Sequence, residues 1–564
     1  MNRKLNPISL ESILALFILL LTLSTGVAVT ATPRLTDFST LQNYSYLIGL
    51  WVMESCFHAS SDSPTFIVGL GLTVMFFIIL VLIAGTILLW TLSRRDTNDF
   101  RHLAGPRLLE YDAAIKDASK KLKREHGKAS LKIHPRLAFT EQLFQGNIFV
   151  TGQQGGGKST FIKPLAHQIY EANDFSFTYD EKGEYHEICQ SKSIIHLALT
   201  PNSEFIWDIG KDIKTENDAG LVAQALLGNS NDNERFFTDA AQQILKYVIV
   251  YLYETKTDWS WKDLYDSLFC SDNSLKLILA KTSPSSAILI ETNSKTTHSI
   301  RSVLSTRLHW LKEMSALQRT SKSYWSISQL VNRTGKAKHV FFEPNTCSPD
   351  LSRYVCNALV TLIIERWLAQ KDSQTNKLWL IIDELGNLPK NPSILRWLTL
   401  SRSKGGRLIA GTQSYSQLYD AYGENSSETM LSLFRTVVVM RLGASGESAQ
   451  KASELFGKQR VMTLNQSISH DKKQTISTQY HDRAVVTRED IINLPSSDKR
   501  GVVGYLMIGG LVNVYKLKWP HYLYNPKTLR SVETARQRNS KDFPQKKSVN
   551  RLNRRTKVKM GGAS

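Results

Sequence analysis

The stretch that decides the fold is Ile148–Thr160, which reads IFVTGQQGGGKST. Three apolar, strand-favouring residues lead into a glycine-rich loop, and a helical pattern follows the Lys-Ser pair. Gly152 and Gly157 occupy the fixed glycine positions of the spacing G-x-x-x-x-G-K-[ST]. Backbone N–H groups that wrap around phosphate oxygens need a loop without side chains, which glycines provide. A chance glycine loop is the alternative, but the strand before it and the helix after it favour nucleotide binding.

The residues of this loop have distinct expected roles toward ATP. The helix that begins near Lys158 directs its positive end at the phosphates. Lys158 should reach the β- and γ-phosphates, and the Ser159 hydroxyl should hold Mg²⁺. The residues expected to bind the nucleotide are Gly152, Gln153, Gln154, Gly155, Gly156, Gly157, Lys158, Ser159 and Thr160.

A second motif lies far downstream, where the apolar run Leu378–Ile382 ends in Asp383 and Glu384. An apolar strand closed by two acids has the form of a Walker B motif. Asp383 should complete the Mg²⁺ shell, as in other P-loop enzymes. Glu384 is placed to polarise the attacking water. An Asp-Glu pair after a strand is common by itself, and the full P-loop upstream is what makes it informative.

The next strand, Arg407–Gln413, and the segment before it supply two more candidates. Gln413 ends the strand, where a neutral amide can sense the γ-phosphate and transmit its loss; a structural amide is the alternative. Arg402 follows a helix and precedes the flexible pair Gly405-Gly406. An arginine at this position is expected to reach the nucleotide of a neighbouring subunit and to add transition-state charge there.

The size and charge of the chain bound the possible functions. Its 564 residues are enough for several domains at ~150 residues each. Lys and Arg total 70 against 50 Asp and Glu, which gives a net charge of +20. This excess favours an anionic partner, either nucleic acid or a lipid surface, although it is also compatible with solubility alone. The five cysteines show no C-x-x-C pair and no metal-ligand spacing, so reduced thiols are expected.

Two apolar runs near the N-terminus predict a membrane anchor over residues 1–95. Residues 13–31 form a run about as long as a bilayer is thick, and residues 65–92 form a longer run without charge. A cleaved signal peptide is the alternative for the first run, since small residues occur late in it. Basic residues flank the outer ends of both runs, so the positive-inside rule places both termini in the cytoplasm and the short loop in the periplasm.

The remaining chain divides into a connector, a core, an insert and a tail. Residues 96–136 are expected to form a basic, helical connector that either touches lipid headgroups or is an ordinary solvated helix. An α/β nucleotide-binding core over 137–213 and 332–525 is interrupted by an all-α insert over 214–331, where apolar residues follow the 3.6-residue period. Residues 526–564 hold twelve Lys and Arg but two acids, which predicts a disordered tail that binds DNA, RNA or lipid without sequence preference.

Three local expectations concern the core. Residues 175–184 should form a strand that ends in a charged turn near the nucleotide crevice, although a surface turn would look alike. Residues 457–479 are mostly polar and should form a loop. Residues 501–518 should form two closing strands around Gly509-Gly510.

With these motifs placed, the sequence resembles the type IV coupling proteins of the TraD class, the inner-membrane ATPases of conjugation and type IV secretion. The resemblance covers most of the chain. Its most specific motifs are DELGNLP at Asp383–Pro389 and GTQSYSQL at Gly411–Leu418, with Lys404–Gly406 between them, and YDEKGE at Tyr179–Glu184 also matches. The resemblance implies a RecA-like motor domain, a hexameric ring and an all-α domain that receives substrate.

The resemblance also implies roles for single residues. Arg402 matches the position of the family's arginine finger, and Gln413 matches its sensor glutamine. The longer F-type relatives carry an acidic C-terminal region that docks a relaxosome protein, whereas this sequence ends in a basic tail. The docking partner of this chain therefore stays open.

These observations together predict a membrane-anchored hexameric ATPase that moves single-stranded DNA, with its attached relaxase, toward a type IV secretion channel. Contact with DNA would be made through phosphates and would be sequence-nonspecific. One alternative is an ATPase of the same kind that recruits protein effectors only, and another is a membrane adaptor whose nucleotide site is structural. The complete P-loop and acid pair disfavour the adaptor. Two spans and the lack of an LSGGQ-like signature make an ABC transporter a poor fit.

Overall fold

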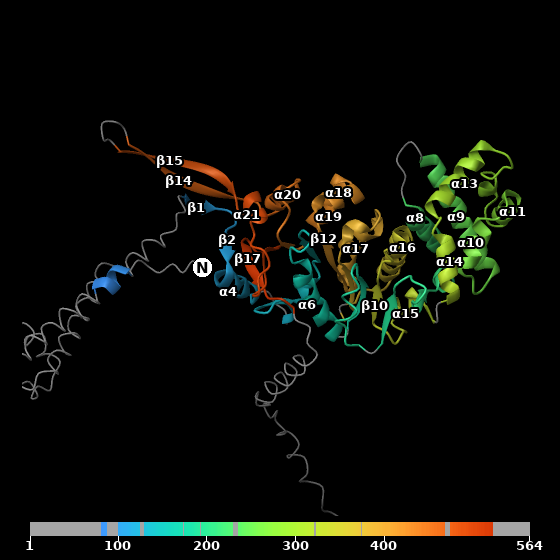
Figure 1. Ribbon diagram of the computed structural model, residues 1–564, viewed down its shortest axis with the longest axis horizontal. Coiled ribbons are helices and arrows are strands. Elements are labelled where there is room, and N and C mark those ends of the chain that lie inside the picture. Colours follow the sequence, from blue (N-terminus) through green and yellow to red (C-terminus); the bar gives the residue numbers. More distant parts are fainter. Residues whose placement is uncertain are drawn as a thin grey trace, which may run out of the picture. The chain divides into compact units, whose positions relative to one another are not determined.

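A computed structural model describes most of the chain between residues 81 and 522 (Figure 1). The described ranges are 81–86, 100–124, 129–172, 174–191, 193–228, 235–320, 323–373, 375–468 and 474–522. The chain divides into two compact units, one comprising residues 1–105 with 459–483 and the other residues 106–458 with 484–564.

The expected membrane anchor and tail fall almost wholly outside the described ranges. Residues 13–31 and 526–564 are not among them, and of the run 65–92 only residues 81–86 are described, as a helix. Within the described part of the chain, no helix has the length and apolar content needed to cross a bilayer.

The larger unit is built on a ten-stranded sheet. The spatial order of its strands is β2 (Leu108–Glu110), β17 (Val514–Trp519), β16 (Val502–Ile508), β13 (Thr436–Val439), β5 (Ile148–Thr151), β12 (Gly406–Thr412), β11 (Leu378–Ile382), β6 (Phe175–Tyr179), β10 (His339–Phe342) and β7 (Ile194–Leu197). From β13 to β7 neighbouring strands run parallel, whereas β16 is antiparallel to both β13 and β17. The expected strand pair around Gly509-Gly510 is thereby confirmed.

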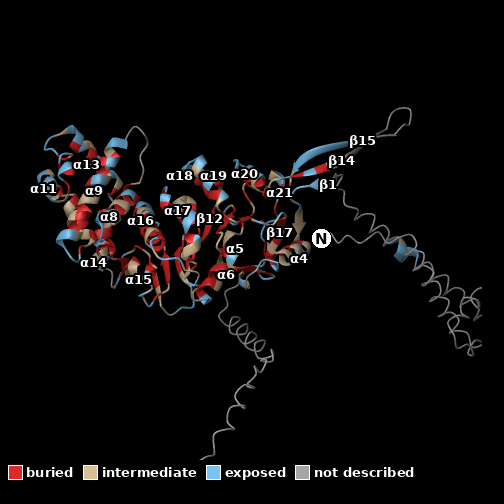
Figure 2. Ribbon diagram, turned by 180° about the vertical axis from the view of Figure 1, so that it is seen from behind, coloured by how far each residue is buried: buried red, intermediate tan, exposed pale blue. Residues whose placement is uncertain are grey.

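Buried residues cover both faces of this sheet. In β5, Phe149 belongs to one apolar cluster, while Ile148 and Val150 belong to another on the opposite face. Helix α16 (Pro349–Leu368) contributes to the first cluster and α6 (Lys158–Glu171) to the second. Because both faces are covered, β5, β11 and β12 are buried along their whole length (Figure 2). This explains why their sequences are continuous apolar runs and not alternating ones.

Short helices and two strand pairs complete the larger unit around the sheet. These elements are β3 (Ala129–His134), β4 (Leu137–Thr140), α5 (Glu141–Phe144), β8 (Phe205–Trp207), α7 (Ile209–Asp212), β9 (Ser323–Trp325), α15 (Ile327–Val331), η3 (Leu385–Asn387), α17 (Pro392–Leu400), η4 (Ser401–Lys404), α18 (Tyr415–Tyr422), α19 (Glu424–Ser432), α20 (Ser448–Leu455) and α21 (Arg488–Ile492).

A run of helices occupies the chain between β8 and β9. These helices are α8 (Glu216–Leu227), α9 (Arg235–Thr255), α10 (Trp261–Leu268), α11 (Asp272–Thr282), α12 (Pro284–Ala287), α13 (Lys295–Arg307) and α14 (Leu311–Thr320). Thr215 and Ser260 cap α8 and α10 with complete capping boxes, which explains where these helices begin. The apolar stripe of α9 is buried against its neighbours, and α8 packs on α16 of the sheet domain.

The interval 96–136 is not the purely helical connector that was expected. It contains the strands β1 (Phe100–Ala104), β2 and β3, and its helix is α4 (Tyr111–Leu122). Ala114, Ile115 and Ala118 of α4 are buried in the same apolar cluster as α6, while the lysines lie on the other face. The buried stripe of α4 was not predicted because the many lysines of this segment suggested a solvent-exposed helix.

The expectation of a loop over 457–479 is wrong. Residues Lys458–Ile468 and Gln474–Ala484 form β14 and β15, which join β1 in a three-stranded sheet of the smaller unit. Strand β1 is antiparallel to β14. Residues 477–483 are exposed, so their sequence lacks the alternation of apolar and polar residues by which a half-buried strand is recognised.

A charge cluster around the buried Arg407 lies at the amino ends of the parallel strands. Glu141 accepts hydrogen bonds from Lys377 at 2.6 Å, from Arg407 at 2.9 Å and from the Ser130 hydroxyl at 2.5 Å. Arg407 is 1% exposed. Burial raises the pKa of Glu141, but the hydrogen bonds from Lys377, Ser130 and Arg407 outweigh it and leave the pKa at about 2.

We expect Glu141→Gln to destabilise the protein by about 3 kcal/mol at neutral pH, because it leaves the buried Arg407 without its carboxylate partner. The folded pKa of about 2 lies below the ordinary 4.5, so the stabilisation by Glu141 is complete above pH 4.5 and is lost as the pH falls toward 2. Denaturant unfolding measured across this window should show a shallower pH dependence for the variant. The exposed Glu187→Gln is the control, and an equal pH dependence of wild type and Glu141→Gln would contradict the assignment.

Candidate functional site

All predicted site residues except Arg402 converge, because parallel strands end at the same edge of a sheet. Thr151 of β5 lies opposite Thr412 of β12, and Ile382 of β11 lies opposite Tyr179 of β6. The P-loop follows β5, the acid pair follows β11 and Gln413 follows β12. These segments therefore meet at the carboxyl edge, where ligands bind in open α/β sheets.

The P-loop conformation requires its glycines. Gly157 has φ +108°, and a Cβ there would lie 2.4 Å from Cγ1 of Val502. Gly155 has φ +72°. The Gln153 N–H donates to the Arg441 carbonyl at 2.9 Å, and the Gly156 N–H donates to the Gln153 carbonyl at 2.8 Å. Helix α6 begins at Lys158, so Ser159 and Thr160 lie in its first turn, where unpaired N–H groups attract anions.

An ion pair joins the two motifs directly. The Lys158 ammonium donates to Oε2 of Glu384 at 2.6 Å, and the two side chains are 11% and 3% exposed. The other oxygen of Glu384 accepts the Gln413 backbone N–H at 3.0 Å. The P-loop lysine and the carboxylate of the acid pair thus neutralise each other.

Asp383 lies beside this pair in a deeply buried position. The Tyr185 hydroxyl donates to its Oδ1 at 3.0 Å. Burial raises the pKa of Asp383, the charge of Lys158 and the Tyr185 hydroxyl lower it, and the carboxylates of Glu384 and Asp180 raise it again, with a net increase. A carboxylate destabilised in this way is suited to a hard cation such as Mg²⁺, which would supply the missing positive charge.

The charged turn after β6 supplies a further carboxylate. Asp180 is fully buried, and its two oxygens accept the backbone N–H groups of Glu184, Tyr185 and His186 at 2.9, 2.8 and 3.3 Å. Asp180 therefore fixes the loop that brings the Tyr185 hydroxyl to Asp383. The strand and turn were expected near the nucleotide crevice, but the role of Tyr185 was not anticipated because its partner lies 198 residues away.

Arg402 lies at the opposite edge of the sheet. It belongs to η4, which precedes β12, and its Nε donates to Gln145 Oε1 at 3.3 Å. Strand β12 has seven residues, which span about 20 Å. Arg402 is exposed there and does not join the P-loop of its own chain. Gln413, by contrast, is at the carboxyl edge beside Glu384.

A cavity next to the P-loop contains a basic residue that the sequence reading missed. Its volume is about 200 Å³, and its lining is Gln153, Gln154, Gly155, Gly156, Arg441, Pro495, Ser496 and Ser497. The Arg441 Nη1 donates to the Ser496 hydroxyl at 2.6 Å. Arg441 follows the buried strand β13, the parallel neighbour of β5, and that position was the available signal.

A P-loop and an acid pair at the carboxyl edge of a largely parallel sheet define the chain as a RecA-like nucleotide-binding protein. Residues 131–519 match the family model described as type IV secretion-system coupling protein DNA-binding domain. The match covers more than half of the sequence, and the chain belongs to the type IV secretion-system coupling protein family.

Individual relatives agree with this assignment. Coupling protein TraD of Escherichia coli strain K12 is 23% identical over 427 residues, which cover 74% of this chain and 59% of TraD. The unbound bacterial conjugative coupling protein TrwBΔN70 superposes with a TM-score of 0.63 at 21% identity, over 75% of this chain and 96% of that one. TrwB in complex with ADP and Mg²⁺ gives a TM-score of 0.63 at 21% identity, over 76% and 96% of the two chains. These structural matches show a shared fold.

We expect Asp383→Asn to raise the stability of the nucleotide-free protein at neutral pH by about 1 kcal/mol, because it removes a charge that burial disfavours. The raised pKa fixes the sign of the pH dependence. The cost of Asp383 is absent below its unfolded pKa of 3.8, grows as the pH rises above that value, and is complete above the folded pKa.

Thermal unfolding of wild type and Asp383→Asn, without Mg²⁺, at several pH values measures this difference. The gap between their midpoints should open above about pH 4. Tyr185→Phe, which removes the hydroxyl donor but keeps the charge, should shift the midpoint downward. If Asp383→Asn were less stable than the wild type at pH 7, the carboxylate would stabilise the fold, and the prediction would be wrong.

Proposed function

We propose that this chain is an ATP-hydrolysing coupling protein that moves single-stranded DNA, with its attached relaxase, to a type IV secretion channel. The observation that carries the proposal is the contact between Lys158 and Glu384, which joins two motifs 226 residues apart in one charged site. With a nucleotide phosphate at this site, Lys158 would bind the phosphate and Glu384 would act on the attacking water.

The residues at the carboxyl edge divide the work of hydrolysis. The P-loop N–H groups and Lys158 bind the phosphates, and Ser159 and Asp383 hold Mg²⁺. Mg²⁺ held by these residues would supply positive charge that screens the phosphates. Glu384, released from Lys158, accepts a proton from the attacking water. Gln413 is joined to Glu384 through its backbone N–H, so movement of this carboxylate is passed to β12 and α18.

The position of Arg402 supports an oligomeric ring. This arginine lies at the amino edge of its own sheet, so as a finger it would serve the nucleotide of a neighbouring subunit. A homohexamer, as expected from the family, places the amino edge of one subunit against the P-loop of the next.

The sequence and the family support the proposed partners. The family model is described as a DNA-binding domain, and the net charge of +20 suits a polyanion bound through its phosphates. The two apolar runs support an inner-membrane anchor that holds the motor at the channel. Relaxase and channel components are proposed as partners because DNA in transfer carries one and passes through the other.

Hydrolysis of ATP by the full chain, with and without single-stranded DNA, tests the function. We expect DNA to stimulate the rate, and the stimulation to fall steeply with salt. Lys158→Ala and Glu384→Gln should each lower the rate by roughly 10²–10³-fold, since each removes a charged group that acts on the reacting phosphate. The control is Lys163→Ala. It removes the ion pair between Lys163 of α6 and Glu184 and leaves the P-loop intact.

Each other outcome identifies a different protein. Hydrolysis that protein cargo stimulates and DNA does not would indicate an ATPase for protein effectors. Nucleotide binding that survives without hydrolysis, with transfer unaffected by Lys158→Ala and Glu384→Gln, would indicate a structural adaptor.

Mixing two inactive variants tests the role of Arg402. Arg402→Ala should lower hydrolysis by roughly 10³-fold while nucleotide affinity is kept. Lys158→Ala subunits retain the arginine, so adding them to Arg402→Ala subunits should restore part of the activity. The control is Arg396→Ala. It removes an exposed arginine of α17 that pairs with Glu365 of α16, and it should leave the rate of hydrolysis unchanged. Wild-type hydrolysis by Arg402→Ala alone would exclude it as the finger.

A further inference from the structure

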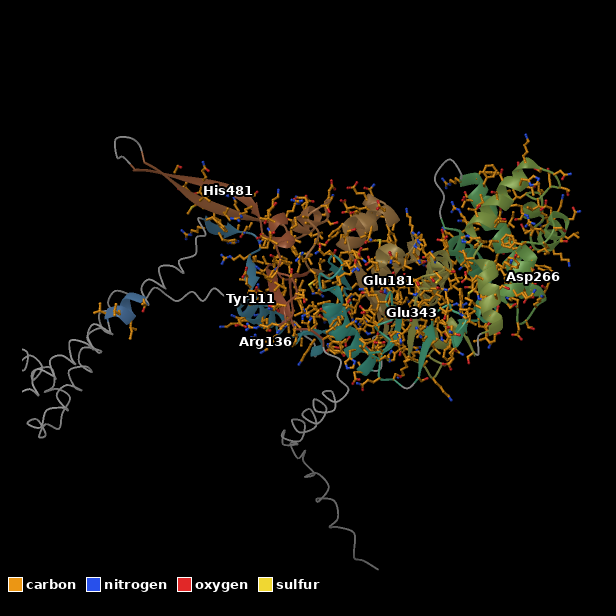
Figure 3. All side chains as sticks on the ribbon, viewed as in Figure 1. Tyr111, Arg136, Glu181, Asp266, Glu343 and His481 are labelled. Carbon is orange, nitrogen blue, oxygen red and sulfur yellow. The ribbon has the colours of Figure 1, made fainter. Side chains whose placement is uncertain are left out.

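Two histidines and a glutamate gather on the sheet beside the nucleotide site. Strand β10 is the parallel neighbour of both β6 and β7. His196 belongs to β7, Glu343 follows β10 (Figure 3), and His186 lies in the loop after β6. The three side chains each offer one ligand atom, and these atoms lie within 4.8 Å of one another. Segments far apart in sequence thus present one small cluster of metal-binding groups.

We propose that His186, His196 and Glu343 form a binding site for a divalent metal ion of the zinc type. Two imidazole nitrogens and one carboxylate oxygen are a ligand set that Zn²⁺ accepts, with a fourth position left for water. The side chains of the three residues are 28%, 31% and 34% exposed, so an ion can enter from solvent. This site is separate from the Mg²⁺ position assigned to Ser159 and Asp383.

The surroundings of His186 match those of a metal-bound histidine. Its Nδ1 is buried without a hydrogen-bond partner, and the nearest carboxylate oxygen, Oδ2 of Asp180, is 3.6 Å away. Asp180 is held in place by backbone N–H groups. A metal-bound histidine commonly donates its second ring nitrogen to such a carboxylate, which fixes the tautomer that offers Nε2 to the metal.

The remaining ligands need only small side-chain movements. His196 Nε2 lies 2.7 Å from Glu343 Oε2, and the rings of His186 and His196 stack with centroids 4.4 Å apart. Ligand atoms around a tetrahedral Zn²⁺ are about 3.3 Å apart, which follows from Zn–N lengths of about 2.0 Å. The backbone already holds Glu343 in place, since its N–H donates to the Leu197 carbonyl at 3.0 Å. A bound ion would therefore separate His196 Nε2 and Glu343 Oε2 slightly, and rotation of the His186 ring would bring its Nε2 to the ion.

Metal at this position would act on the nucleotide site through one loop. His186 is adjacent to Tyr185, whose hydroxyl donates to Asp383. An ion bound by His186 would hold the end of the loop that Asp180 fixes at its start. This consequence rests on the proposed function, whereas the metal site itself does not.

Calorimetric titration of the full, chelator-treated chain with ZnCl₂, without nucleotide, tests the site. We expect one Zn²⁺ per chain to bind through this cluster, and Co²⁺ in its place to give the absorption spectrum of a low-symmetry nitrogen- and oxygen-ligated ion. His196→Ala should abolish the binding of this one Zn²⁺ ion. Glu343→Gln should weaken it by at least roughly 10- to 100-fold, as even second-shell losses do. Asp383→Asn and the exposed His298→Ala should leave it unchanged.

Three results would overturn the proposal. The first is that the wild type binds no Zn²⁺. The second is that His196→Ala or Glu343→Gln binds Zn²⁺ as the wild type does. The third is that His298→Ala loses Zn²⁺ binding to the same extent as His196→Ala. Loss of Zn²⁺ binding in Asp383→Asn alone would place the ion at the nucleotide site, which also contradicts the proposal. Unfolding midpoints without metal identify any variant that fails to fold, and Glu343→Gln, which keeps the side-chain shape, then decides the outcome. Because no nucleotide is present, the result does not depend on ATP hydrolysis.

Discussion

The ion pair between Lys158 and Glu384 is the interaction on which the rest of the site depends. Both side chains are almost fully buried, and removing one partner of such a pair costs about 3–5 kcal/mol because an uncompensated charge is left behind. Neither side chain can therefore move away from the other unless another charged group takes the place of the lost partner. In the proposed function, a nucleotide phosphate would take the place of Glu384, and Mg²⁺ would offset the repulsion of Asp383 by the carboxylates of Glu384 and Asp180.

The sheet makes this pair possible. Two motifs 226 residues apart meet within 2.6 Å here because their strands are parallel and end at the same edge. The order β13-β5-β12-β11-β6 places Arg441, the P-loop, Gln413, the acid pair and Asp180 side by side along that edge. The same geometry sends Arg402, which precedes β12, to the other edge. If Arg402 acts as the proposed finger, this strand direction means that it would serve the nucleotide of another subunit.

How much could be predicted from the sequence depended on whether a residue's partners leave a local pattern. The P-loop glycines, Asp383 and Glu384 could be found because each follows an apolar run and because phosphate binding dictates a fixed spacing. Tyr185 could not be assigned to Asp383, since a hydroxyl 198 residues away carries no spacing signal. The same holds for His186, His196 and Glu343, which only the neighbouring positions of β6, β7 and β10 bring together. Strand β15 was missed because its exposed residues 477–483 do not alternate between apolar and polar. Helix α4 was taken for part of a connector because its lysines dominate the composition, although Ala114, Ile115 and Ala118 are buried.

A double-mutant cycle on Lys158 and Glu384 tests the central claim most directly. Lys158→Met, Glu384→Gln and the double variant would be unfolded with denaturant, without nucleotide and with saturating nucleotide and Mg²⁺. The ion pair predicts a coupling energy of about 1–3 kcal/mol without nucleotide. It also predicts that nucleotide removes most of this coupling, because the phosphate takes the place of Glu384. Additive effects of the two substitutions in the nucleotide-free protein would contradict the account.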